Sequence, residues 1–322
     1  MTPGALDARV LYARAPAARD PGSAWLGAEP AARAQAACVA RRLAALGVRA
    51  LLPGEPGWPE GLSDLRHPPR VAFVRGRLPE RRRAVAIVGS RAASPYGAAQ
   101  AHALASDLAR LGYTVVSGLA RGIDGAAHRG ALAAGGARVG VLAGGLDEVT
   151  PRHHRELAEE LCVRGGLVSE IPTGAPLHRG GFVERNRLIA ALCSAVVVVE
   201  AALRSGALST AAAARRLGRA LFAVPGDVDR PTARGAHALL RAGARLCERA
   251  GDVLQALEAS GGSDDAPESR LLAALGPTAR TAESLAREAH LALDQALGVL
   301  LALEWSGVAE ALPGQRWRRA AP

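Results

Sequence analysis

The sequence contains no lysine, only 3% aromatic residues, and no pair of cysteines at metal-ligand spacing. Its four cysteines, Cys38, Cys162, Cys193 and Cys247, stand far apart, so neither a disulfide framework nor a zinc site is expected. No apolar run reaches the roughly 20 residues of a membrane span, and the N-terminus lacks a basic-then-apolar leader. We therefore expect a cytoplasmic protein with no membrane partner.

Two nucleotide-binding motifs are also missing. GxGxxG does not follow the first strand of the predicted sheet, and GxxxxGK followed by Ser or Thr occurs nowhere. NAD and ATP are therefore disfavoured, and we expect no cofactor.

The net charge of +10 suggests a polyanionic partner. Abundant alanine and arginine without lysine are equally typical of a codon-biased genome, so the total charge does not decide the matter. Its distribution is more informative. Residues 261–322 hold six arginines and eight acidic residues, a net of −2, which leaves +12 for residues 1–260. Any anion site is therefore expected outside the C-terminal part.

Short apolar runs alternate with helical stretches from about residue 70 onward. Ser94 and Pro95 are typical of a helix start, and Gly112 of its end. Near-continuous apolar strands between helices indicate a mostly parallel sheet covered on both faces. We therefore predict a doubly wound, Rossmann-like α/β fold, with strands at 71–76, 84–89, 113–118, 138–145, 166–170, 195–200 and 220–226.

Composition divides the chain into four parts. Residues 1–51 are predicted to be a degenerate helical segment or partly disordered, residues 52–255 the α/β domain, and residues 256–266 a polar linker. Residues 267–320 have the helix and hairpin pattern of a winged helix, with Thr281 as a helix cap. Its would-be recognition helix, 292–306, carries acidic residues and no basic one, which favours a protein contact or a structural role over DNA.

The loops that follow the predicted strands carry the chemistry. Five of six contain glycine, which lets backbone N–H groups approach an anion closely. Ligands of open parallel sheets bind at the carboxyl ends of the strands, so the sequence predicts a phosphate or nucleotide site there. The triplet 185–187, Arg-Asn-Arg, precedes the strand at 195–200 by one helix; we expect one arginine to order the loop, through Glu184, Glu170 or Glu200, and the other to face the ligand.

Histidines near these loops could suggest catalysis or a metal. Asp124 and His128 stand four residues apart and could form an acid–base pair. We favour instead a structural role for both, with Asp124 as a helix cap and His128 packed beneath the loop. His153 and His154 lack a carboxylate or cysteine at ligand spacing, so a solvated helix start is favoured over a metal site.

Several stretches together resemble the DNA-processing protein A (DprA/Smf) family, among them AIVGSRAASPYG, VVSGLARGIDGAAHRGAL, FVERNRLIA and RSGALSTA. The resemblance implies an extended Rossmann-like domain that binds single-stranded DNA without cleaving it, and therefore no enzyme. It further implies a homodimer that protects incoming DNA in natural transformation and loads the RecA recombinase.

Together with the loops, the resemblance implies a set of DNA- or phosphate-binding residues. They are Gly89, Ser90, Arg91, Ser117, Gly118, Arg121, Gly122, Asp124, Gly144, Arg152, Arg155, Phe182, Arg185, Asn186, Arg187, Ser205, Gly206 and Thr210. Self-association would use residues 236–246, with Leu239, Leu240 and Leu246. Glu184 stands where the family is often basic, and Thr150 where it has an aromatic residue. Phe182 is the candidate for base stacking.

Two other functions fit the same pattern less well. A phosphoribohydrolase-like enzyme on this scaffold would need a carboxylate in the loop at 204–216, and there is none. A transcription factor would use the winged helix, whose charge is unsuitable.

Overall fold

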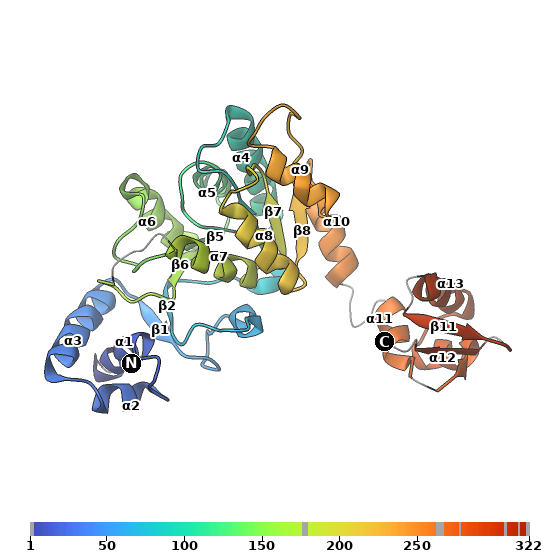
Figure 1. Ribbon diagram of the computed structural model, residues 1–322, viewed down its shortest axis with the longest axis horizontal. Helices are drawn as coiled ribbons and strands as arrows, with labels where there is room; N and C mark the ends of the chain where they lie inside the picture. Colours follow the sequence, from blue (N-terminus) through green and yellow to red (C-terminus); the bar gives the residue numbers. More distant parts are fainter. Residues whose placement is uncertain are drawn as a thin grey trace. The chain divides into compact units, whose positions relative to one another are not determined.

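A computed structural model describes residues 3–175, 180–261, 267–276, 278–305, 308–314 and 316–319 (Figure 1). The chain forms two compact units, residues 1–255 and 256–322. In the described part, no helix combines the length and the apolar character that crossing a bilayer requires.

The first unit is built on one sheet with the strand order β1-β2-β6-β5-β4-β3-β7-β8-β9. The strands are β1 (Arg49–Leu51), β2 (Ala72–Gly76), β3 (Ala84–Val88), β4 (Thr114–Ser117), β5 (Arg138–Val141), β6 (Gly166–Ser169), β7 (Ala195–Val198), β8 (Ala220–Ala223) and β9 (Arg245–Leu246). Strands β3 to β9 run parallel, whereas β2 is antiparallel to β6 and β1 to β2. The predicted α/β fold and its strands are confirmed; β1 and β9 are additional edge strands.

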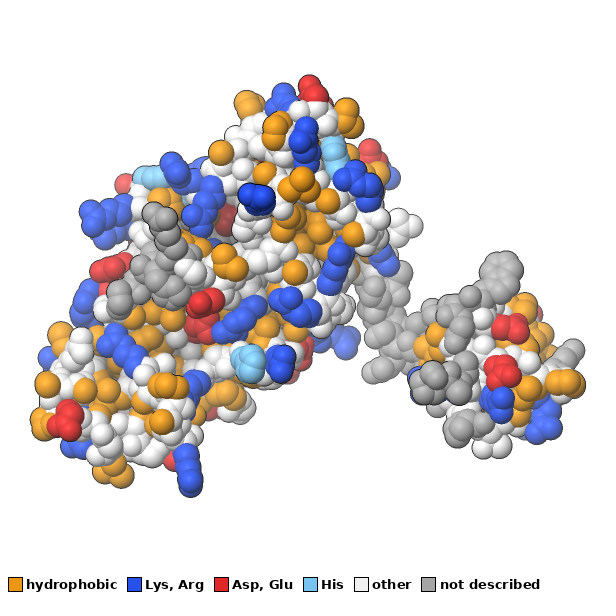
Figure 2. Space-filling model, viewed as in Figure 1, with side chains coloured by type: hydrophobic (Ala, Val, Ile, Leu, Met, Phe, Trp, Pro, Cys, Tyr) orange, Lys and Arg blue, Asp and Glu red, His pale blue; other side chains and the backbone are white. Residues whose placement is uncertain are grey.

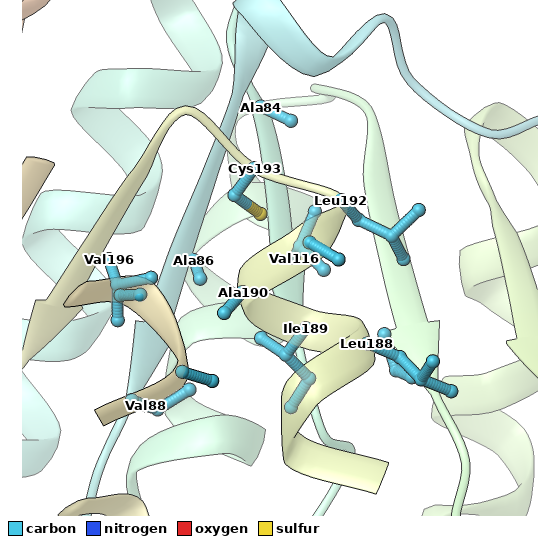
Figure 3. Packing of buried hydrophobic residues seen from close by; sticks show 14 of the residues in the cluster. Ala84, Ala86, Val88, Val116, Leu188, Ile189, Ala190, Leu192, Cys193 and Val196 are labelled. Carbon is cyan, nitrogen blue, oxygen red and sulfur yellow. The ribbon is translucent and has the colours of Figure 1, made fainter. Parts of the chain in front are cut away.

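Helices cover both faces of this sheet. They are α4 (Pro95–Arg110), α5 (Ile123–Ala133), α6 (Arg155–Arg164), α7 (Gly181–Ala191), α8 (Ala207–Arg216) and α9 (Arg234–Arg241); α10 (Ala250–Gly261) follows the last strand in the chain. Figure 1 shows α7 and α8 in front of the sheet and α4 and α5 behind it. Figure 3 shows how Leu188 and Ile189 of α7 pack among small side chains of the strands, such as Ala86 and Val116. Small residues on the strands let the helices approach the sheet closely.

The start of α4 follows the sequence prediction. Ser94 caps the helix by accepting a hydrogen bond from the Gly97 amide at 3.0 Å, Pro95 is the first helical residue, and Gly112 follows the end with φ +80°. These residues fix where the helix begins and ends.

Residues 3–45 are helical, with α1 (Pro3–Arg14), α2 (Pro21–Leu26) and α3 (Pro30–Ala45). They share a buried apolar cluster with β2 and α6 that includes Val10, Leu43, Phe73 and Leu161. Of the two alternatives for this segment, the helical one therefore describes the structure. Short 3-10 helices η1 (Glu60–Asp64), η2 (Arg81–Arg83) and η3 (Arg152–His154) interrupt the later connections.

The second unit has a small sheet of order β10-β12-β11, with β10 (Arg280–Thr281), β11 (Ala309–Leu312) and β12 (Arg316–Arg319). Three helices precede or separate these strands: α11 (Pro267–Ala274), α12 (Ala282–Glu288) and α13 (Leu293–Trp305). The side chain of Thr281 accepts from the Ser284 amide at 3.3 Å, as the predicted cap requires. Helix α10 reaches Gly261, so residues 256–261 of the predicted linker are helical, and 262–266 lie outside the described residues.

Candidate functional site

The candidate site lies where the strand order changes direction. The chain places β4, β5 and β6 on one side of β3 and then returns to place β7 on its other side. Such a switch point leaves a crevice at the carboxyl ends of the strands. Here the loops after β3, β4 and β7 are tied together: the Ile123 amide donates to the Ser90 carbonyl at 3.1 Å, and the Ser90 amide to the Glu200 carbonyl at 2.7 Å.

A cleft of about 700 Å³ opens at this point; we call it the switch-point cleft. Figure 2 shows arginine side chains, in blue, over the end of this unit that carries the labels α4, α5 and α9 in Figure 1. The lining of the switch-point cleft includes many residues predicted from the sequence: Gly89, Ser90, Arg91, Asp124, Phe182, Arg185, Asn186, Ser205, Gly206 and Thr210. Loops that are far apart in the sequence therefore converge on one edge, as predicted.

Two glycines are required by the close packing of these loops. Gly122 has φ +74°, and a Cβ atom on it would stand 2.8 Å from the Arg91 carbonyl oxygen. A Cβ atom on Gly118 would stand 2.5 Å from Arg185 Nη2 and 2.7 Å from Asp124 Oδ2. Only glycine fits at either position without displacing a neighbouring loop or a buried charged group.

Arg185 and Asp124 organise the loop after β4 from beneath. The Arg185 guanidinium donates to the carbonyls of Gly118, at 2.8 Å, and Val141. Asp124 accepts from the Gly118 amide at 3.1 Å. Burial lowers the pKa of Arg185 to about 10 although Asp124 opposes the shift, and burial raises the pKa of Asp124 although Arg185 opposes it.

These contacts correct part of the predicted binding set. Arg185 is 4% exposed and Asp124 6% exposed, and their charges are directed at the protein's own loop. They are positioning residues, and Arg185 orders the loop through backbone carbonyls rather than through one of the three predicted glutamates. Ser117 is also buried and donates to the Ile87 carbonyl at 2.6 Å, so it is not a direct contact either.

We predicted that Arg187 would face the ligand in the cleft, and this prediction is wrong. Its guanidinium forms an ion pair with Glu170, and its side chain is not part of the cleft lining. The pairing with Glu170, one of the three alternatives from the sequence, is therefore the one observed. Between the two arginines, Asn186 donates to the Gly206 carbonyl at 3.0 Å and to Ser209 Oγ at 2.9 Å, which ties α7 to the start of α8.

Exposed arginines surround the cleft and the neighbouring loops. Arg91 lies over the ring of Phe182, with its guanidinium carbon 4.4 Å from the ring centroid. Arg91, Arg121 and Arg204 are exposed, and within the described residues none of them is in an ion pair. Arg204 lines the cleft, but we did not include it in the predicted set. Arg204 could have been included from the sequence, because it stands one residue before Ser205, a predicted binding residue.

The remaining predicted residues lie beside the cleft or inside the protein. Arg121, Gly122, Gly144, Arg152 and Arg155 belong to loops or helix starts at the same strand ends, outside the cleft lining. Thr210 lines the cleft, but its side chain is buried and its hydroxyl has no partner among the described residues.

The histidines are structural. His128 is fully buried, and burial with the nearby His154 lowers its pKa to about 3. His154 is also buried, with Nδ1 3.0 Å from the Leu119 carbonyl, so a solvated helix start describes His153 alone. Leu119 has φ +56°, a left-handed conformation that this contact helps to hold. Across the described residues, no group of three His, Cys, Asp or Glu side chains is placed to hold a metal ion.

The predicted self-association surface needs one correction. Leu239 is only 9% exposed and packs in the core beneath α9, so a second copy cannot reach it. Leu240 packs against the same core, whereas Leu246, on the edge strand β9, is 49% exposed. Of the three leucines, Leu246 is therefore the most exposed.

Comparison with known proteins gives two family matches. Residues 49–258 match the model of DNA recombination-mediator protein A, and residues 253–315 match the DprA winged helix domain. The chain is 50% identical over 192 residues to a putative DNA processing protein DprA of Mycobacterium tuberculosis, covering 59% of this chain and 49% of that protein. It is 44% identical over 192 residues to protein Smf of Escherichia coli, covering 59% and 51%. The chain therefore spans about half the length of these two relatives.

Solved structures agree with this match. DNA processing protein A of Streptococcus pneumoniae superposes with a TM-score of 0.60 at 30% identity, covering 79% of this chain and 86% of that one. DNA processing protein A of Helicobacter pylori, described with a single-stranded DNA binding mode, gives 0.59 at 28% identity, covering 66% and 96%.

Proposed function

This chain belongs to the DNA recombination-mediator protein A family, and from that membership we propose that it binds single-stranded DNA at the switch-point cleft. The single-stranded DNA binding mode of the Helicobacter pylori relative supports the choice of ligand. The strand's phosphates would lie along the carboxyl ends of β3, β4 and β7.

The proposal rests on the difference between the buried and the exposed charged residues at the cleft. Buried Arg185 and Asp124 hold the loops, while exposed Arg91, Arg121 and Arg204 have no carboxylate partner in the described part. Unpaired guanidinium groups suit phosphate oxygens because their planar fork donates two parallel hydrogen bonds. No sequence preference is expected, because phosphate contacts carry no base information.

Phe182 completes the proposed contact. Phe182 is partly exposed, lines the cleft and lies under the Arg91 guanidinium. A base could stack on the ring while Arg91 binds the adjacent phosphate, which is a sequence-tolerant arrangement. Phe182 is the aromatic residue among the described residues that line the cleft.

We propose that the cleft binds DNA without catalysing a reaction on it. Among the described residues that line the cleft, Asp124 has the one carboxylate, which is buried and accepts hydrogen bonds from its own loop. A phosphoribohydrolase would need a carboxylate that reaches its substrate. For the wider role we propose what the sequence resemblance implies: protection of incoming DNA in natural transformation, loading of RecA, and a homodimer to which Leu246 contributes.

Binding of a labelled oligo(dT) strand, followed by fluorescence anisotropy over a salt series, tests the proposal. Arg91→Ala/Arg204→Ala should weaken binding and reduce the slope of log K against log salt by ~1.4, about 0.7 for each phosphate that is no longer neutralised. The matched control is Arg41→Ala/Arg216→Ala, which removes two exposed arginines outside the lining of the switch-point cleft.

If the two double variants had equal slopes of log K against log salt, the DNA strand would have to bind outside the switch-point cleft. Release of ribose phosphate from nucleoside monophosphates by the wild type, and not by Asp124→Asn, would instead favour the enzyme.

A further inference from the structure

A second groove opens at the opposite, amino end of the parallel strands. It has a volume of about 750 Å³ and is formed by η1, the end of β2, η2 and Leu192 after α7; we call it the amino-edge groove. Segment 75–83, Arg-Gly-Arg-Leu-Pro-Glu-Arg-Arg-Arg, runs along it. Nothing in the proposed function uses this segment.

The amino-edge groove carries more positive than negative charge. Arg49, Arg77, Arg81 and Arg82 line it, against Glu60 and Glu80. Arg77 and Arg82 are exposed, and the described residues offer neither of them an ion pair. Arg81 stands 3.8 Å from Asp64, but that carboxylate also pairs with Arg219 and cannot neutralise both guanidinium groups.

Apolar side chains line part of the amino-edge groove. Pro59, Leu78 and Pro79 line it beside Trp58, whose indole is held by a 2.9 Å hydrogen bond from Nε1 to Ser63 Oγ. Arg49 is held as well, because it donates to the Gly76 carbonyl at 3.2 Å. The amino-edge groove thus combines arginines with apolar side chains, as the switch-point cleft does where Arg91 lies over Phe182.

We propose that the amino-edge groove is a second site for single-stranded nucleic acid, so that one molecule holds two strand segments at opposite edges of its sheet. Phosphates would bind Arg77 and Arg82, and sugars or bases would lie on the proline and leucine surface. The choice of ligand rests on the function proposed for the switch-point cleft. The existence of an anion site rests on the groove alone.

Calorimetric titration of the full chain with oligo(dT) of about ten nucleotides tests the proposal, since that length fits one site rather than two. The wild type should bind two equivalents per chain. Arg77→Glu/Arg82→Glu should bind one, with the affinity of the remaining site within about twofold of wild type. Arg41→Glu/Arg216→Glu changes the net charge equally outside both sites and should keep both equivalents.

Cross-linking of the wild type to a thiothymidine-containing oligo(dT) gives a readout that does not depend on how a variant folds. Peptides from residues 57–82 should be labelled in addition to those around Phe182. Labelling around Phe182 alone, or two equivalents retained by Arg77→Glu/Arg82→Glu, would overturn the second site.

Two further outcomes separate the proposals. In one of them, the wild type binds only one equivalent of oligo(dT). If Arg77→Glu/Arg82→Glu abolished that binding and Arg91→Ala/Arg204→Ala left it unchanged, the result would support the site in the amino-edge groove and refute the site in the switch-point cleft. Binding of a polyglutamate peptide to the wild type, abolished in Arg77→Glu/Arg82→Glu while oligo(dT) binding is unchanged, would assign the groove to an acidic protein and overturn the proposal.

Discussion

The buried pair of Arg185 and Asp124 gives the sharpest test of how the loop after β4 is held. Arg185→Met keeps much of the side-chain volume but removes the donor to the Gly118 and Val141 carbonyls. It also leaves the Asp124 carboxylate buried without its cation. Arg185 and Asp124 attract each other through space without a direct hydrogen bond, so the cost of about 3–5 kcal/mol for breaking a buried ion pair in contact is an upper bound for this variant. That is a large share of a total stability of about 5–15 kcal/mol.

A double-mutant cycle separates the two parts of this cost. In an Asp124→Asn background no carboxylate is left unpaired, because the asparagine side chain is neutral and still offers an oxygen to the Gly118 amide. Arg185→Met should then cost only about 1–3 kcal/mol, for the unsatisfied carbonyls. Urea denaturation followed by circular dichroism measures all four free energies of unfolding. Equal costs in the two backgrounds would show that Arg185 does not compensate Asp124.

The pH dependence has a definite sign. Burial raises the pKa of Asp124 and Arg185 opposes the rise, so the folded Arg185→Met variant holds this proton to higher pH than the wild type. The unfolded chain releases it near a pH of about 3.9. The folded variant therefore binds more protons above that value, and its stability falls as the pH rises. Its deficit against the wild type should be smaller at about pH 4 than at about pH 7, and a constant deficit would refute the reasoning.

Three further predictions concern the same loops. Gly118→Ala places a methyl group 2.5 Å from Arg185 Nη2, so it should cost about 1–3 kcal/mol and lower the melting temperature. Ser94→Ala removes both the cap on α4 and a 2.5 Å hydrogen bond to Glu200, which should cost about 1–2 kcal/mol in urea denaturation. Burial lowers the pKa of His128 to about 3, below its unfolded value of about 6.5, so stability should rise with pH across this window. His128→Leu should flatten that rise, as melting temperatures at about pH 5 and about pH 7 would show.

The strands were predictable because their signal is local. Runs such as the one at 195–198 are apolar at every position, which a central parallel strand requires. The edge strands were missed for the opposite reason. Strand β9 has two residues, both exposed, so it has no apolar pattern to detect. Its existence depends on parallel pairing with β8, which only the fold provides.

The roles of individual site residues were less predictable. Arg185 and Arg187 are two positions apart and chemically identical, yet one is buried under Gly118 and the other pairs with Glu170. The difference arises from neighbours that are distant in sequence, at 118, 141 and 170. Leu239 illustrates the same limit, because an amphipathic helix shows which residues are apolar and not which of them the sheet covers.

The division of labour among the arginines has a consequence for binding. Arg185 already donates to two carbonyls, so its charge cannot release a condensed counterion when a strand arrives. Arg187 would first have to leave Glu170. Salt dependence should therefore report the exposed arginines alone, and the buried ones should act through geometry. A variant of Arg185 that remains folded should lose affinity without a change in salt slope, whereas loss of Arg91 or Arg204 should lower both. The two measurements together distinguish a residue that shapes the cleft from one that contacts phosphate.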